Sequence, residues 1–340
     1  MKAIPLKNRN LIFYLLFSII LIVLAIGATT IGVVTIPFQD VIQIILNQLG
    51  LSDVSHIPEN HVLTVVQLRL PRIIMSIFSG AALAICGAVF QSVFRNPICD
   101  PYILGISSGA SLGAAIAFIL GLDIIIFGIT LPALFTALIT LVVILGISKM
   151  SKRNSTETLL LTGIAINFLI SAVITLLIVL NKQEMQKIIF WTMGSLASVS
   201  YKEILFFLPL FIGSTFFLFY YSKDLNIMQL GGDTAKTLGV NSSKVTVITL
   251  FISSLLIAAV VSICGVIGFI GLIVPHIVRI IWGNNNRTLF VFSLFFGAIF
   301  LLIADTLSRT IAINSELPVG SITAIAGAPY FIYLLLRRKV

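Results

Sequence analysis

Charged side chains are scarce in this sequence, since only 10% of its 340 residues are Asp, Glu, Lys or Arg. Soluble globular domains carry about 25% charged residues, so the chain is excluded from that class. It has instead 59% hydrophobic residues and a mean hydropathy of +1.15. A membrane-spanning helix needs about 20 apolar residues, so the length allows roughly ten spans in a single transmembrane domain. We take residues 1–340 as that domain.

Cysteine is also rare, and its three copies, Cys86, Cys99 and Cys264, form no CxxC pair. Neither a disulfide framework nor a metal site is predicted. The sequence has no GxxxxGK[ST] motif, which excludes ATP binding by a P-loop of its own. Acidic residues within apolar segments are few, Asp305 being the clearest, so a proton-coupled carrier would lack its usual relay. We expect no catalytic residue, cofactor or metal, and energy must enter from outside the chain.

Hydropathy divides the chain into ten transmembrane helices, which predicts an all-α membrane protein. The expected spans are residues 11–34, 71–93, 103–121, 125–147, 158–180, 204–221, 245–264, 267–282, 289–309 and 318–336. With cytoplasmic N- and C-termini, most of the 21 Lys and Arg residues lie inside, as the positive-inside rule requires. The net charge of +9 is therefore explained by the basic residues at the cytoplasmic ends of the spans. It does not indicate nucleic-acid binding, because the basic residues are scattered between apolar segments and not clustered. The outer connection after the first span begins with a predicted amphipathic surface helix.

The segment 221–244 is a long polar stretch between two apolar segments of the sequence, and it faces the cytoplasm in this topology. Glycines there predict one or two short helices that are joined at a Gly pair and end at Gly239. The residues that we single out are Met228, Leu230, Gly231, Gly232, Ala235, Leu238 and Gly239. Two interpretations stay open: a solvated loop, or a docking element for a soluble partner.

Two further groups of polar residues each allow two interpretations. Arg69, Arg72 and Arg309 lie near span ends on the outer side, against the charge rule. They either extend to lipid headgroups or pair with carboxylates of an outer partner. Asn167, Ser171 and Thr175 share one face of the fifth span. Such a stripe either joins helices or lines a water-filled path.

The segment Gly105–Gly109 reads GISSG and matches the GxSxG pattern of serine hydrolases. His276 is the one histidine in a membrane segment that could assist it. The nucleophile elbow requires a preceding strand, which an all-helical membrane chain does not offer. A glycine-rich packing surface is therefore the favoured interpretation.

Specific motifs are spread over nearly the whole chain. They are LRLPR (68–72), GAALAICGAVFQSVFRNPICDPYILGISSGASLG (80–113), GDTAKTLGV (232–240), GVIGFIGLIVPHIVR (265–279), LLIADTLSR (301–309) and ELPVGSITAIAGAPYFIYLL (316–335). These segments resemble the FecCD-type permeases of ABC importers for iron chelates, haem and vitamin B12.

The resemblance implies ten spans per subunit in the bacterial plasma membrane, surrounded by lipid. The implied partners are a cytoplasmic ABC ATPase dimer, an extracytoplasmic binding protein (lipoprotein or periplasmic), and a second permease subunit, identical or homologous. The chain would not be an enzyme, because ATP hydrolysis belongs to the ATPase. An iron(III)-siderophore is the expected cargo, with haem or cobalamin as alternatives. A secondary transporter and an intramembrane serine hydrolase are the alternatives from other classes.

The resemblance also assigns roles to residues. It implies that the segment 228–240 forms the coupling helices that contact the ATPase. It implies that Arg69, Arg72 and Arg309 pair with glutamates of the binding protein. The loop containing Ser155 and Thr156 matches the cytoplasmic gate. The fifth and tenth spans would line the pathway, which gives Asn167, Ser171 and Thr175 their expected place.

Overall fold

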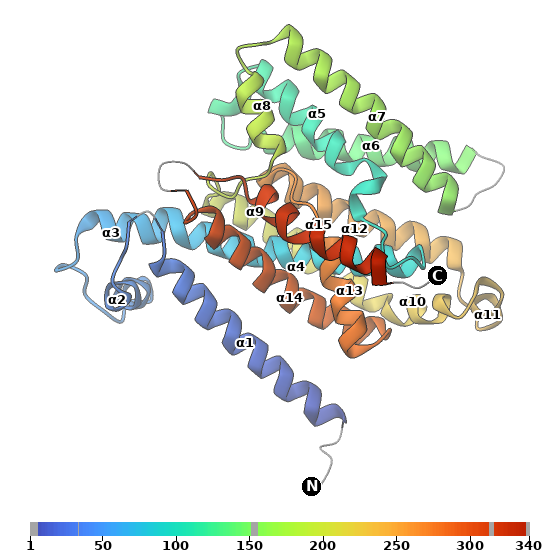
Figure 1. Ribbon diagram of the computed structural model, residues 1–340, viewed down its shortest axis with the longest axis horizontal. Coiled ribbons are helices and arrows are strands. Elements are labelled where there is room, and N and C mark those ends of the chain that lie inside the picture. The colour runs from blue at the N-terminus through green and yellow to red at the C-terminus, as the bar shows by residue number, and fades with distance from the viewer. Residues whose placement is uncertain (1–5, 33, 151–155, 313–315, 338–340) are drawn as a thin grey trace.

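The computed structural model describes residues 6–32, 34–150, 156–312 and 316–337, and every regular element within them is a helix (Figure 1). The all-α class is therefore confirmed. Seven described helices are long and apolar enough to cross a bilayer: α1 (Leu6–Thr30), α4 (Leu70–Val93), α6 (Thr130–Met150), α7 (Thr156–Leu180), α9 (Tyr201–Tyr220), α12 (Ser242–Cys264) and α14 (Asn286–Ser308). Shorter apolar helices are α5 (Ile106–Ile119), α13 (Ile270–Trp282) and α15 (Val319–Arg337). Each expected span thus contains an apolar helix, while the count of ten crossings stays a prediction.

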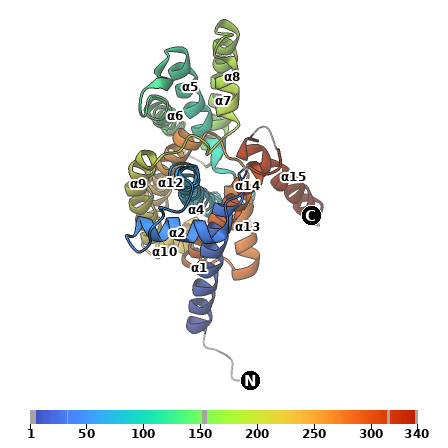
Figure 2. The ribbon, with the colours of Figure 1, turned by 90° about the vertical axis from the view of Figure 1, so that its left-hand side faces the viewer.

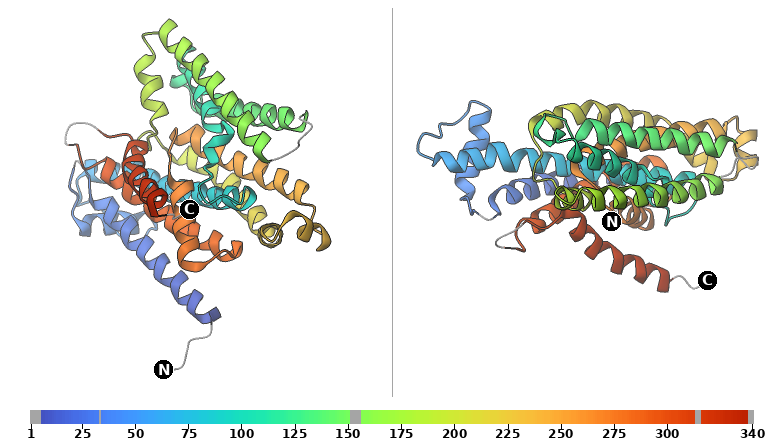
Figure 3. Two further views of the ribbon diagram at one scale, coloured as in Figure 1. Left: turned by 45° about the vertical axis from the view of Figure 1, so that its right-hand side comes forward. Right: turned by 90° about the horizontal axis from the view of Figure 1, so that it is seen from above.

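Short elements lie at the two opposite ends of the long helices (Figures 1 and 3). One end, called the α2 end, carries α2 (Phe38–Gln48), α3 (Glu59–Leu63) and the π-helical turn η1 (Thr64–Arg69). The other, called the α10 end, carries α10 (Ser222–Gln229) and α11 (Gly232–Thr237). The connecting elements are the 3₁₀ turns η2 (Pro101–Leu104) and η3 (Leu122–Ile124) and the helix α8 (Met185–Thr192). Helix α2 is the expected amphipathic helix, and it buries Val41 and Ile44.

Helix α4 matches the expected second span, residues 71–93, but helical backbone also precedes it. Helical backbone runs without a break from Glu59 to Val93, through α3, η1 and α4. Pro71 lies inside this continuous helix, directly after a π-helical turn, and it has no backbone N–H to donate to the preceding turn. The wider π-helical turn before it absorbs the change of geometry. Arg69 and Arg72 therefore lie inside one long helix and not at its start.

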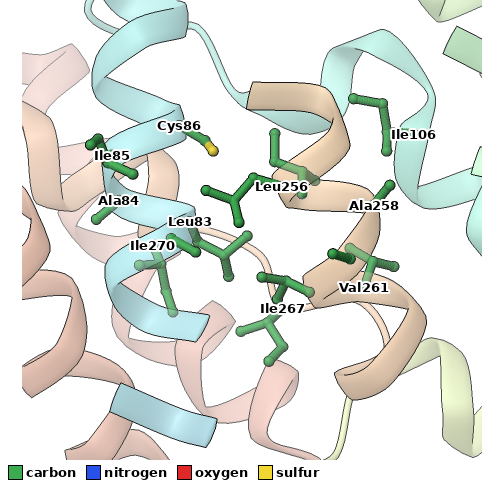
Figure 4. Close-up of a cluster of buried hydrophobic side chains, with 14 of the residues drawn as sticks. Leu83, Ala84, Ile85, Cys86, Ile106, Leu256, Ala258, Val261, Ile267 and Ile270 are labelled. Carbon is green, nitrogen blue, oxygen red and sulfur yellow. The ribbon is translucent and has the colours of Figure 1, made fainter. Parts of the chain in front are cut away.

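Helix α4 is the centre of the fold, and nearly all of its residues are buried. Figure 4 shows Leu83 and Cys86 of α4 facing Leu256 of α12. Ile270 of α13 lies beside α4, and Ile106 of α5 lies on the far side of α12. The core is thus formed by helices from distant parts of the sequence.

Glycines allow α4 to approach two other helices at backbone distance. A Cβ atom at Gly80 would collide with the carbonyl of Gly297 on α14, and one at Gly87 would collide with the carbonyl of Gly271 on α13. Small residues at helix crossings permit this close packing in membranes. Gly80, Gly87 and Gly271 are therefore packing positions between helices.

Helix α7 packs loosely against the rest of the chain. With α5, α6 and α8 it forms a group on the side of α4 opposite α1 (Figure 2). Large apolar side chains of α7 are exposed, among them Phe168 at 75% and Leu161 at 67%. Exposed apolar side chains on a spanning helix face lipid or another subunit.

Candidate functional site

The polar segment 221–244 folds into two short helices, α10 and α11, as expected. Gly231, at φ +123°, makes the turn between them, and Gly239, at φ +81°, follows α11. The backbone N–H of Val240 donates to the carbonyl of Ala235 over 2.9 Å, and that of Gly239 to the carbonyl of Lys236 over 3.0 Å. These two bonds form a Schellman motif, which favours a glycine at this position. The prediction of a C-terminal glycine cap is confirmed.

The apolar residues of this segment point in two directions. Met228 is 3% exposed and Ala235 is fully buried, both within the main core of the chain. Leu230 and Leu238 are 67% and 57% exposed. Met228 and Ala235, which the sequence analysis singles out with Leu230 and Leu238, are therefore not available to a partner. They anchor the segment to the bundle, and the other two are available to a partner.

A chain of hydrogen bonds connects α10 to the long helices. The side-chain oxygen of Asn226 accepts a bond from the backbone N–H of Asn286 over 2.7 Å. The Ser92 hydroxyl donates to Oδ1 of Asn286 over 2.6 Å. Asn286 begins α14 and Ser92 lies near the end of α4, and both are buried. Sequence reasoning missed these residues, because only the fold brings positions 92, 226 and 286 together.

The three outer arginines are buried at the α2 end, each 5% exposed. Arg72 donates to Asp305 over 2.8 Å and to Glu316 over 2.7 Å. Arg309 lies 3.5 Å from the other carboxylate oxygen of Asp305. A buried carboxylate between two guanidinium groups is a strongly coupled network. Three positive charges share two negative ones, so the cluster keeps a positive excess.

Backbone carbonyls near the end of α1 and in the segment after it accept further hydrogen bonds from this cluster. Arg69 donates to the carbonyls of Thr29 and Val34, and Arg309 donates to the carbonyl of Ala28 over 3.1 Å. The arginines therefore do not extend freely to lipid headgroups. A cavity of about 260 Å³ lies against the cluster, and its wall includes Arg69, Arg72, Arg309 and Glu316. The expected docking role of these arginines stays a prediction.

The polar stripe of α7 takes little part in packing within the chain. Asn167 is half-buried, and Ser171 and Thr175 are exposed. The Thr175 hydroxyl donates to the carbonyl of Ser171 over 2.9 Å, a bond within the helix. Of the expected gate residues, Ser155 lies outside the described residues, and Thr156 is the first residue of α7.

Comparison with known proteins decides the family. The model of the FecCD transport family matches residues 19–337. The chain belongs to this family. It is 38% identical to the uncharacterized ABC transporter permease protein YvrB of Bacillus subtilis, over 98% of this chain and 96% of that protein. It is 40% identical to the cobalamin import system permease protein BtuC of Halobacterium salinarum, over 84% of this chain and 76% of that protein.

A solved structure agrees with the FecCD assignment. It is described as an inward-facing conformation of a metal-chelate type ABC transporter. The alignment has a TM-score of 0.83 at 30% identity and covers 96% of this chain and 99% of the other. This FecCD protein is thus a multi-pass plasma-membrane permease of an ABC importer. FecCD permeases are transport components and not enzymes, and in the family ATP hydrolysis belongs to partner ATPases.

The names of FecCD relatives do not determine the cargo of this chain. Some are named for cobalamin, others for haemin, an iron chelatin or molybdate. The GISSG segment has a packing role in this FecCD chain. The Ser108 hydroxyl donates to the carbonyl of Gly105 over 2.9 Å, and a Cβ atom at Gly109 would collide with Thr140 of α6. These contacts place small residues where α5 meets α6.

Proposed function

We propose that this FecCD permease forms, with a second identical or homologous permease subunit, the membrane pathway of a binding-protein-dependent importer for an iron(III) chelate. Ten helices cross the membrane, and both termini lie with the α10 end in the cytoplasm. The bias of Lys and Arg residues supports this orientation. So does the arrangement in Figure 3, where the α2 and α10 ends lie at opposite extremes of the long helices.

The pathway lies between the two subunits, beside the exposed face of α7. A hydroxyl or amide that faces hydrocarbon without a partner is unfavourable. Asn167, Ser171 and Thr175 are partly or fully exposed on α7. The Thr175 hydroxyl bonds within the helix, but the Asn167 amide is too polar for hydrocarbon, so water or a second subunit is the suitable neighbour of this face. Thr156, the first residue of α7, acts at the cytoplasmic gate together with Ser155, its neighbour in the sequence.

The observation that carries the proposal is the connection from α10 into the bundle. Leu230 and Leu238 dock in a groove of a cytoplasmic ATPase dimer, helped by the glycine turns at Gly231, Gly232 and Gly239. Movement of the docked segment passes through Met228 and Ala235, which are packed in the core. It also passes through the bond between Asn226 and Asn286. This arrangement lets ATP hydrolysis in a partner move α4 and α14.

The extracytoplasmic binding protein docks at the α2 end. The positive excess of Arg69, Arg72 and Arg309 attracts acidic side chains of that partner. Glu316 is 47% exposed and binds Arg72, so a carboxylate of the partner competes with it.

An uptake assay tests the proposal. The permease, its ATPase and its binding protein are reconstituted in vesicles, and uptake of a radiolabelled iron(III)-siderophore is measured with and without ATP. We expect uptake that requires ATP and the binding protein. Uptake of haem or cobalamin in place of the siderophore would contradict the proposed cargo but would still agree with an ABC importer. Uptake driven by an ion gradient without ATP would contradict the proposal.

A further inference from the structure

A small polar cavity at the α10 end belongs to none of the features described so far. Its volume is about 270 Å³. The wall is made by the end of α4, the loop after it, α10, α13 and the loop before α14, through Gln91, Arg95, Pro97, Gln229, Arg279 and Asn284. Two of these six residues are arginines, and none of the six is acidic. The cavity therefore has a concentrated positive charge that its own wall does not neutralise.

Arg279 is the main donor in this cavity. It lies in the last turn of α13, and its Nε and Nη2 atoms are buried without a hydrogen-bond partner among the described residues. The buried Arg72 differs, because it reaches two carboxylates. A buried guanidinium group without an acceptor is unfavourable. The site thus suits a ligand that brings acceptor oxygens.

Two glutamines complete the set of unpaired groups. Nε2 of Gln229 is buried and has no partner among the described residues. Gln91 is 1% exposed, and its Nε2 donates to the carbonyl of Leu272 over 2.9 Å, which leaves Oε1 as an unpaired acceptor. The wall therefore offers guanidinium and amide donors together with one acceptor for a hydroxyl.

We propose that this cavity binds a phosphate group, either in the headgroup of an anionic lipid or as free phosphate. The planar guanidinium fork matches two phosphate oxygens. Gln229 donates to a third oxygen, and Gln91 accepts from a P–OH or a headgroup alcohol. Ile280 and Ile281 follow Arg279 and are 66% and 57% exposed, so acyl chains can lie against the same helix end. Basic residues at a cytoplasmic surface attract anionic lipids.

The test uses the purified full-length permease and two lipids with identical acyl chains. Native mass spectrometry measures retention of phosphatidylglycerol and of diacylglycerol, which lacks the phosphate. Thermal unfolding in inorganic phosphate, against chloride at equal ionic strength, measures binding of the free anion. Preferential retention of phosphatidylglycerol supports a lipid headgroup. Stabilisation by phosphate with equal retention of both lipids supports the free anion.

Variants separate this cavity from general charge attraction. Arg279→Gln should weaken phosphate-dependent binding by about tenfold, the value of a charged hydrogen bond. Arg279→Lys should recover part of it, and Arg287→Gln, an exposed arginine at the same end, should match the wild type. If Arg279→Gln does not fold, Arg95→Gln in the exposed loop gives the same comparison. Wild-type protein that distinguishes neither lipid nor phosphate, or equal losses in Arg287→Gln and Arg279→Gln, would overturn the proposal.

Discussion

Asn226 of α10 accepts a hydrogen bond of 2.7 Å from the backbone N–H of Asn286, the first residue of α14. Asn286 in turn accepts a bond from the Ser92 hydroxyl of α4. Helices α4 and α14 also meet at backbone distance through Gly80 and Gly297. The α10–α11 segment is therefore connected to the most tightly packed helix pair around the centre of the fold.

Removing this connection should uncouple the ATPase from transport. Asn226→Ala leaves the Asn286 N–H without its acceptor, at a cost of ~1–3 kcal/mol. Because Leu230 and Leu238 stay in place, the ATPase should still co-purify, while uptake per ATP hydrolysed falls. Lys223→Ala, an exposed change on the same helix, serves as the control. Normal uptake in Asn226→Ala would assign the bond to local stability alone.

The arginine cluster at the α2 end should matter for stability. Arg72→Ala leaves Asp305, which is fully buried, without its closest cation, and breaking such a pair costs about 3–5 kcal/mol. The midpoint of thermal unfolding should fall clearly. Arg287→Ala, at an exposed position, should leave it unchanged. Equal midpoints for both variants would show that the pair contributes nothing.

The same cluster should control docking of the binding protein. Glu316→Gln removes a half-exposed negative charge beside Arg72. We expect about fivefold tighter binding of an acidic partner, or ~1 kcal/mol, and weaker binding of the wild type as salt rises. Surface plasmon resonance measures both effects. The control is Asp53→Asn, an exposed change near the same end. If the affinity for the binding protein changes neither with salt nor with Glu316→Gln, the arginine cluster does not dock the binding protein.

Cysteines placed along the α7 stripe should report a water-filled path. Asn167→Cys, Ser171→Cys and Thr175→Cys should react with a small water-soluble thiol reagent more in one nucleotide state than in another. The native cysteines are buried. Burial, and then the nearby Asp100 charge, raise the pKa of Cys99 to about 12, so this thiol stays protonated and unreactive at neutral pH.

Leu169→Cys, at a 61% exposed position on the side of α7 away from the stripe, is the control and should stay unreactive, because thiols in lipid ionise poorly. If the three stripe variants transport cargo but never react, the stripe serves contact between helices or subunits.

The sequence predicts features that depend on local chemistry. Apolar runs located the helices, and the glycines at 231 and 239 located α10 and α11, because glycine adopts positive φ without the steric cost that other residues have. The direction of Ala235 and Met228 could not be predicted, since burial depends on where α10 and α11 dock. The Asn226 connection joins positions far apart in the chain. The helical stretch before α4, from Glu59 through α3 and η1, was not predicted, because Pro71 is a residue typical of a helix start.

The central claim, that a soluble ATPase drives this permease through α10 and α11, is tested most directly by co-purification. Leu238→Arg places a charge on a side chain that is 57% exposed, so the permease itself should fold normally. In a docked groove the unpaired charge would cost several kcal/mol. Ala235→Arg is unsuitable, because Ala235 is fully buried in the chain's own core.

The measurement is the amount of ATPase that co-purifies with Leu238→Arg, with wild type and with Ser243→Arg, an exposed change at the same end. All three should have the same thermal midpoint. We expect that Leu238→Arg loses the ATPase and ATP-driven uptake, while Ser243→Arg keeps both. A stoichiometric ATPase and full uptake in Leu238→Arg would contradict the central claim.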